Sequence, residues 1–239
     1  MERTSGSADG VVINAAGRSL DQLRAALAKI PATAASVQIR GAAGTDRFLM
    51  ALDTPLQLVV EGPLGDYAFA FHRQAQVRVN GAVGDGVAEG MASGVVRIDG
   101  DAGVGAGTAV SGGTLAIYGA AGARCGAALQ GGEIFVRGNV GPGAASGAVG
   151  GTIVIGGDAA EGLGDAMRGT TVFIRGRVAA LGRGAREAPL RERERLRLGL
   201  LLINAGIRGD AKEFRRIVSD ALLQHEARRP RGELDPSWR

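Results

Sequence analysis

Glycine recurs every 19 residues along the middle of this 239-residue chain, and this spacing constrains the fold more than any other feature. Seven glycines follow one another at that interval: Gly62, Gly81, Gly100, Gly119, Gly138, Gly157 and Gly176. The segment ending at Gly41 also has aliphatic residues four and two positions before its glycine, although 21 residues separate Gly41 from Gly62. Repetition at a fixed period is typical of solenoids, in which similar units stack on one another.

Each repeat contains one short strand just before its glycine. The positions four residues before the glycines are aliphatic: Leu58, Val77, Val96, Leu115, Ile134, Ile153 and Val172. The positions two residues before them are β-branched: Val60, Val79, Ile98, Ile117, Val136, Ile155 and Ile174. Because side chains alternate along a strand, both sets face the same side and predict a common core.

Further glycines mark the corners of each unit. One lies three residues after the repeat glycine in most units, as at Gly84 and Gly103, and another precedes the strand, as at Gly94. Glycine permits positive φ and close approach of neighbouring backbones. Nineteen extended residues span at most about 63 Å, enough for a closed coil of short sides. The repeats lack two-residue hairpin turns at hairpin spacing. The sequence therefore predicts a mainly β protein, a right-handed parallel β-helix (solenoid).

The flanking segments predict covers for the two ends of this solenoid, whose strand edges would otherwise be free to associate. Ser19 and Gln22 form a capping-box pattern before a helix at 20–30. The second flank predicts a helix at 190–204 ended by Gly206, and another from Asp210 to about residue 225. The predicted divisions are a tail and capping helix at 1–36, the β-helix at 37–182, C-terminal helices at 183–227 and a flexible tail at 228–239.

An apolar row is predicted on the outer face of the later coils. It consists of the residues three positions before the repeat glycines: Ala116, Phe135, Val154 and Phe173. The earlier coils have Arg78 and Arg97 at this position. A stacked apolar row of this kind should be shielded from water. Either the C-terminal helices cover it, or a different protein chain docks there, which would make it an assembly interface.

Composition excludes several classes of function. The formal charge is +4 and the pI is about 9.9, but the basic residues are nearly all arginine and are scattered, so nucleic-acid binding is not expected. The single cysteine, Cys125, excludes an internal disulfide and a cysteine-rich metal site. The sequence contains no apolar stretch of membrane-spanning length and no signal-peptide pattern at its start, which predicts a cytoplasmic protein with no membrane partner.

The glycine motif Gly103-Val-Gly105-Ala-Gly107 resembles part of a dinucleotide fingerprint. Such a fingerprint needs a long helix directly after its glycines, whereas another glycine-rich corner follows here, so we interpret the motif as a solenoid corner. His72 occupies the slot that holds Met91 or Leu129 in other coils, which favours a buried, hydrogen-bonded side chain over a general base.

Arg124 and Cys125 are the remaining candidates for chemistry. Arg124 replaces a corner glycine, and its guanidinium could lower the pKa of the neighbouring thiol. The alternative is an unreactive, small side chain. The repeats also place carboxylates near the corners, and their pairing between coils does not follow from the sequence: Asp66, Asp85, Glu89, Glu161 and Asp165. No catalytic, cofactor-binding or metal-binding residue is predicted.

The chain resembles the GXGXG-domain family, which includes the C-terminal β-helix of the glutamate synthase large subunit. Within that family it is most similar to the stand-alone β-helical B chains of N-methylglutamate synthases. Besides Gly103 to Gly107, these segments carry the resemblance: Gly84-Asp-Gly-Val-Ala-Glu89, Met91-Ala-Ser-Gly94, Ala123-Arg-Cys-Gly126, Gly157-Asp-Ala159, Gly162-Leu-Gly-Asp165, Leu181-Gly182, Ala205-Gly-Ile207 and Phe214-Arg-Arg-Ile-Val-Ser219. It spans residues 56–222, and Ala68-Phe-Ala-Phe-His72 departs from it by lacking the corner glycine.

The resemblance implies a scaffold subunit of a glutamate-synthase-like oxidoreductase complex or of an N-methylglutamate synthase complex. Its expected partners are a glutaminase-like subunit and a synthase-like subunit, with FMN and an iron–sulfur cluster on the latter and no cofactor on this chain. A second reading of the same fold is the C-type component of a formylmethanofuran dehydrogenase or formyltransferase/hydrolase complex. A self-assembling β-solenoid and a β-helical enzyme acting on polysaccharide also remain open, although the outward residues are too apolar for a glycan-binding groove.

Overall fold

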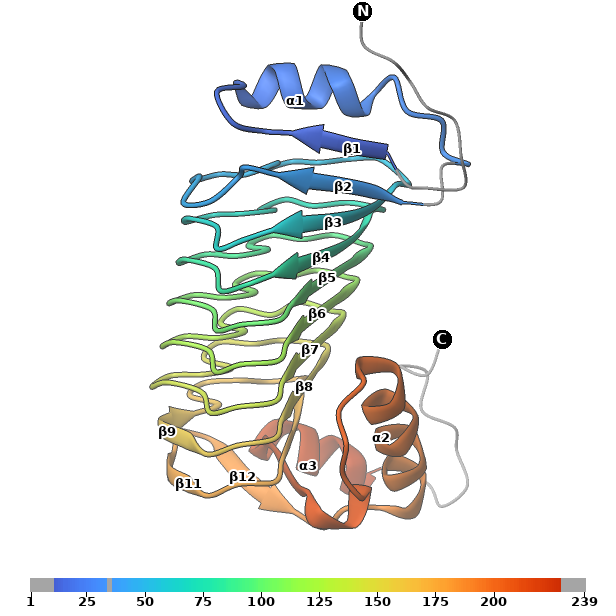
Figure 1. Cartoon of the computed structure of the whole chain (residues 1–239). Helices are drawn as coiled ribbons and strands as arrows, with labels where there is room; N and C mark the ends of the chain where they lie inside the picture. Colours follow the sequence, from blue (N-terminus) through green and yellow to red (C-terminus); the bar gives the residue numbers. More distant parts are fainter. Residues whose placement is uncertain (1–10, 34–35, 229–239) are drawn as a thin grey trace, which may run out of the picture.

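The computed structural model describes residues 11–33 and 36–228. The chain winds into a parallel β-solenoid of about eight turns with short helices at its two ends, as the glycine repeat predicts (Figure 1). The main sheet runs the whole length of the rod, in the order β1-β2-β3-β4-β5-β6-β7-β8-β10-β13-β12. From β1 to β10 all neighbouring strands in it are parallel.

The strands are short, and β3 to β8 and β10 start 19 residues apart along the chain. Their bounds are β1 Val11–Asn14, β2 Val37–Arg40, β3 Gln57–Glu61, β4 Gln76–Asn80, β5 Val95–Ile98, β6 Thr114–Ile117, β7 Glu133–Val136, β8 Thr152–Ile155, β9 Ala159–Leu163, β10 Thr171–Ile174, β11 Val178–Leu181, β12 Ala185–Ala188 and β13 Arg215–Ser219. β9 and β11 form a separate two-stranded parallel sheet.

The strand register places equivalent residues of successive repeats directly beside one another. Val96 in β5 pairs with Leu115 in β6, and Leu115 pairs with Ile134 in β7. These side chains are fully buried and belong to one core that runs through the rod. A second column of parallel bridges at a corner links Leu64, Val83, Ala102, Ala121, Val140 and Ala159.

The repeat glycines allow adjacent coils to approach closely. A Cβ atom on Gly100 would lie 2.6 Å from the backbone nitrogen of Ala82, and one on Gly119 would lie 2.6 Å from the carbonyl oxygen of Gly100. A Cβ atom on Gly138 would similarly lie 2.6 Å from the carbonyl oxygen of Gly119. A side chain at any of these corners would therefore force the coils apart.

The N-terminal flank contributes a strand as well as the predicted helix. The capping box is confirmed, because the Ser19 hydroxyl accepts from the Gln22 amide at 3.2 Å and the Gln22 side chain accepts from the Ser19 amide. Helix α1, Leu20–Leu27, buries Leu23 and Leu27 over the end of the core. β1, which the repeat did not predict, pairs with β2; α1 lies between them in sequence, so the 19-residue spacing does not reach it.

The C-terminal flank agrees only in part with the prediction. Helix α2, Glu192–Ala205, ends as predicted at Gly206, which has φ +67°. The predicted helix from Asp210 to residue 225 is wrong. Asp210 caps only a three-residue 3-10 helix, η1 (Ala211–Glu213), and β13 and helix α3 (Asp220–Arg228) follow. β13 forms because its backbone pairs in antiparallel orientation with β10 and β12 at the end of the sheet.

Candidate functional site

The outer face of the later coils carries the apolar ladder that the sequence predicts. Ala116 pairs with Phe135, Phe135 with Val154, and Val154 with Phe173 along β6, β7, β8 and β10. All four residues are at most 3% exposed. The cluster that buries them comes from the C-terminal flank: Leu198, Leu201, Leu202, Ala205, Ile207, Ala211 and Phe214.

The chain's own helix α2 therefore covers the ladder, and Figure 1 shows α2 lying alongside the second half of the solenoid. Of the two covers that the sequence left open, the structure has the C-terminal helices and not a different protein chain, because the four side chains are enclosed within one chain. Arg197 in α2 also lies 4.0 Å from Glu133 in β7, and burial raises the pKa of that glutamate.

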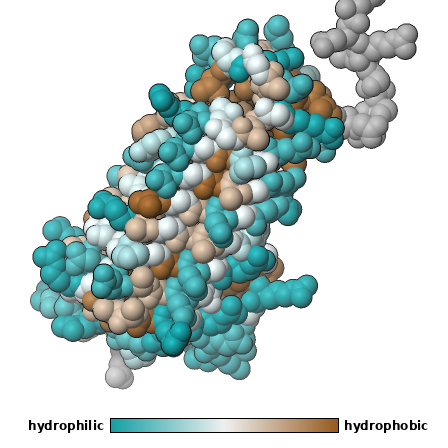
Figure 2. Space-filling view, turned by 60° about the vertical axis from the view of Figure 1, so that its left-hand side comes forward, coloured by the Kyte–Doolittle hydropathy of each residue, from teal (hydrophilic) through white to brown (hydrophobic). Residues whose placement is uncertain are grey.

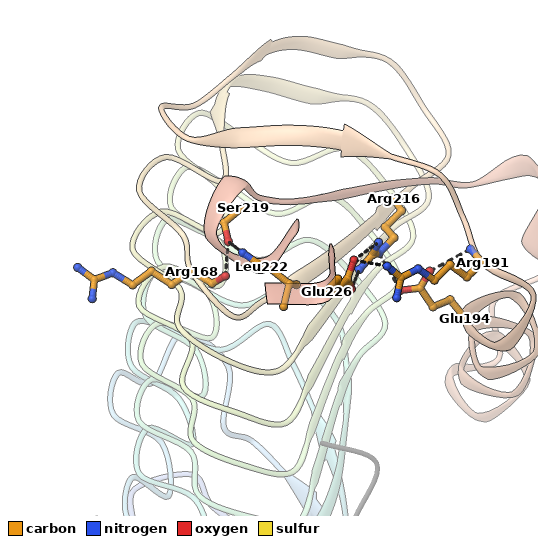
Figure 3. Close-up of polar contacts among 7 residues, drawn as sticks. All are labelled: Arg168, Arg191, Glu194, Arg216, Ser219, Leu222 and Glu226. Atoms are coloured by element: carbon orange, nitrogen blue, oxygen red, sulfur yellow. Dashed lines mark hydrogen bonds and ion pairs between the residues drawn. The ribbon is translucent and has the colours of Figure 1, made fainter. Parts of the chain in front are cut away.

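An ion cluster around the buried Arg216 fixes the start of α2 to the end of the sheet. We define the Arg216 cluster as Arg191, Glu194, Arg216 and Glu226 (Figure 3). Arg216 in β13 is 2% exposed, and its guanidinium donates to Glu226 in α3. Its Nε atom lies 2.7 Å from Glu194 in α2, without hydrogen-bond alignment. Two cations face two carboxylates, so the cluster balances its charge while joining α2, α3 and β13.

Ser219 provides a second link at the same end. Its hydroxyl donates to the carbonyl oxygen of Arg168 in the last coils and accepts from the amide of Leu222 at 3.1 Å (Figure 3). The residue therefore caps the start of α3 and holds it against the solenoid. These two hydrogen bonds explain why a hydroxyl can be buried at this place in the fold.

His72 lies in the core, as the interpretation of a buried, hydrogen-bonded side chain requires. Its Nε2 atom lies 2.9 Å from the carbonyl oxygen of Ala75, and its ring meets that of Phe69 edge-on at 6.2 Å. Loss of hydration lowers the pKa of His72, an effect that the hydrogen bond to Ala75 and the charge of Asp53 partly oppose. Burial inside the rod therefore favours the neutral form of the imidazole.

Arg124 and Cys125 point in different directions and do not form a site. Arg124 is exposed at a corner with φ +61°, whereas the Cys125 side chain is fully buried. Burial raises the pKa of the thiol to about 12. The hypothesis that the guanidinium lowers this pKa is therefore wrong, because loss of hydration disfavours the thiolate.

Corner carboxylates bridge consecutive coils, which the sequence left open. The Asp66 carboxylate accepts from the Asp85 amide at 2.8 Å, and the Asp85 carboxylate accepts from the Val104 amide at 2.7 Å. Asp165 accepts from both the side chain and the backbone of Arg183, whose hydrogen bonds lower the pKa of Asp165 to about 2. The sequence held one signal for this role, because these aspartates recur beside the corner glycines. These carboxylates act as acceptors for backbone amides of the next coil.

The described residues hold no group of three or more histidine, cysteine or acidic side chains placed to bind a metal ion. Within the same ranges, no helix is both long and apolar enough to cross a membrane. The features that the structure does bring together are the apolar ladder, the α2 helix over it and the Arg216 cluster that anchors this helix.

Together these features define a class: a parallel β-solenoid closed by its own terminal helices, with one outer face sealed by a helix that runs along the rod. Comparison with models of known protein families matches none of them, and comparison with curated proteins gives no significant match.

Proposed function

We propose that this chain is the structural, scaffold subunit of a glutamate-synthase-like oxidoreductase complex in the cytoplasm. Its partners would be a glutaminase-like subunit and a synthase-like subunit that carries FMN and an iron–sulfur cluster. The observation that carries the proposal is the uninterrupted stack of 19-residue coils with glycine corners, which has the architecture expected of the GXGXG-domain family that the sequence resembles.

The use of the chain's reactive side chains supports a structural role. Cys125 is in the core with a raised pKa, and His72 bonds to a backbone carbonyl within the rod. Asp85 and Asp165 bind amides of the following coil. These groups stabilise the stack, so a rigid body that positions other proteins is the function that their arrangement favours.

The test is purification of the tagged full chain from its native cells, followed by mass spectrometry and an absorption spectrum of the recovered complex. We expect a flavin-containing, iron–sulfur synthase-like protein and a glutaminase-like protein to be recovered with it. Recovery of one-carbon-transferring enzymes instead would support the role in a formylmethanofuran dehydrogenase complex and overturn the proposal. Polymerisation of the purified chain without partners would support a self-assembling solenoid.

A further inference from the structure

Helix α2 is apolar on two opposite sides. Its inner side buries Leu198, Leu201, Leu202 and Ala205 against the ladder. On the other side, Leu196, Leu200 and Ile203 are 66%, 64% and 75% exposed. Since a helix turns every 3.6 residues, these three side chains form one stripe directly opposite the buried face. A helix that is apolar on both sides is ordinarily enclosed on both.

This stripe differs from the other exposed apolar side chains of the chain. Leu196, Leu200 and Ile203 have the largest exposed fractions among the large hydrophobic residues described. The others are two in β1, two in the coil between β3 and β4, and three single residues farther along the chain: Val11, Val12, Tyr67, Phe71, Val104, Val149 and Leu181. Figure 2 shows small hydrophobic groups separated by hydrophilic residues on the face in view. Among these exposed residues, only those of α2 form a row of three along one side of a helix.

Gly199 lies beside this stripe, halfway along the helix. A Cβ atom there would meet nothing within 4 Å, and the residue does not have the left-handed φ that favours glycine. The fold of the single chain therefore gives no reason for a glycine that weakens the helix. Its absent side chain would instead let a second backbone approach α2 closely at that point.

We propose that a second copy of this chain docks on this face, α2 against α2, in antiparallel orientation. The spacing of Leu196, Leu200 and Ile203 is the alternating four-and-three spacing of a two-helix seam. A two-fold axis near Leu200 brings Leu200 beside Leu200 of the second copy and Leu196 beside Ile203 of the second copy. The same patch is then buried on both copies, as in an isologous dimer.

The charges at the two ends of the stripe fit this orientation. Exposed Glu192 in the first turn of α2 and exposed Arg208 beyond its end are equally far from Leu200 in the sequence. Gly206 ends the helix before Arg208, and Glu192 contacts Arg195 of its own helix at 3.2 Å. The two-fold axis brings the Glu192 end of each helix near the segment of the other copy that carries Arg208. The antiparallel arrangement also places the N-terminal end of each helix dipole near the C-terminal end of the other. A parallel pairing would bring like charges together.

Sedimentation equilibrium of the purified full chain tests this dimer. We expect the mass of two copies for the wild type and of one copy for the Leu200→Glu variant, whose dimer dissociation constant should rise roughly 100-fold or more. Because Leu200 is exposed in the single chain, circular dichroism should show that the variant is folded. Val149→Glu, at an exposed valine away from α2, is the matched control and should remain dimeric.

Two further measurements test the orientation. Glu192→Arg and Arg208→Glu should each weaken the dimer, and the double variant should restore it. Leu200→Cys should form a disulfide between copies under mild oxidation, whereas Cys125 is buried and cannot compete. A wild type that stays monomeric, or a dimer that Leu200→Glu leaves intact, overturns the inference. A dimer without rescue by the charge exchange overturns the antiparallel pairing. These outcomes do not depend on the proposed scaffold function.

Discussion

Gly103 and Gly105 lie two residues apart in one corner, but their surroundings differ. A Cβ atom on Gly103 would lie 2.2 Å from the Asp85 carboxylate and 2.8 Å from the Asp85 backbone nitrogen. On Gly105, which has φ +72°, the nearest atom would be the Thr108 hydroxyl at 3.3 Å. The equivalent corner position of another coil holds Arg124 at φ +61°. Gly103 is thus needed for close approach, whereas Gly105 relieves only backbone strain.

The two glycines should therefore respond differently to the same substitution. We expect Gly103→Ala to lower the free energy of unfolding by about 3 kcal/mol, because the new methyl group collides with the preceding coil. Gly105→Ala should cost about 1 kcal/mol, the strain of a left-handed alanine. Urea unfolding followed by circular dichroism measures both. Equal losses in the two variants would contradict the distinction.

Helix α2 is held on the last coils by two different kinds of contact. Along its length it packs on the apolar ladder, and at its start Glu194 joins the Arg216 cluster. Arg216 is the buried member of this cluster, and removing a buried charge from its partners costs more than losing an exposed ion pair. The cluster therefore decides whether the beginning of α2 stays on the solenoid.

Arg216→Met should detach this element. We expect a loss of about 3 kcal/mol in the local stability of α2 and α3, because Glu194 loses its buried cation and Glu226 keeps only the exposed Arg191. Hydrogen exchange measures this local stability. Amides in α2 and α3 should exchange faster in the variant, while those in β3 to β5 should change little. Arg186→Ala in the adjacent strand is the control. Its ion pair with Asp220 is exposed, so the loss should be below about 1 kcal/mol. Similar exchange in the two variants would count against an anchoring role.

The sequence predicted the elements whose pattern is local and left out those that depend on distant contacts. The strands of the repeat follow from aliphatic alternation and a fixed spacing. β13 was mistaken for helix because a helix cap at Asp210 is visible in the sequence, while its pairing with β10 is not. The ladder was predicted residue by residue. The Arg216 cluster was missed, because it joins α2, β13 and α3 at positions with no common spacing.

At the scale of the whole molecule, a solenoid must close its two ends because each exposes core and strand edge. At the first end, α1 places Leu23 and Leu27 over the core of the first coils, in the same buried cluster as Val37 and Ile39. At the other end, β13 and β12 reverse the strand direction and end the parallel stack. The stack of coils therefore stops at α1 on one side and at β12 and β13 on the other.

Opening the first end should make the rods associate. We expect Leu23→Asp to release α1, because a carboxylate at a position that is 2% exposed cannot stay in the core. Species larger than those of the wild type should then appear in sedimentation velocity, since apolar core becomes accessible. Ala25→Asp, on the exposed side of the same helix, should sediment as the wild type does. Unchanged sedimentation of Leu23→Asp would show that α1 is not the barrier to association.

The position of α2 limits how the rod can change in length. The helix has 14 residues, about 21 Å, and its ladder comes from four consecutive strands of the main sheet, β6, β7, β8 and β10. An additional coil within this stretch would carry the anchor at β13 away from the far end of the helix. A coil added before β6 would disturb neither the packing of α2 on the ladder nor its anchor at β13. Growth or shortening by complete 19-residue units is therefore confined to the N-terminal half, while the covered half is a block of fixed size.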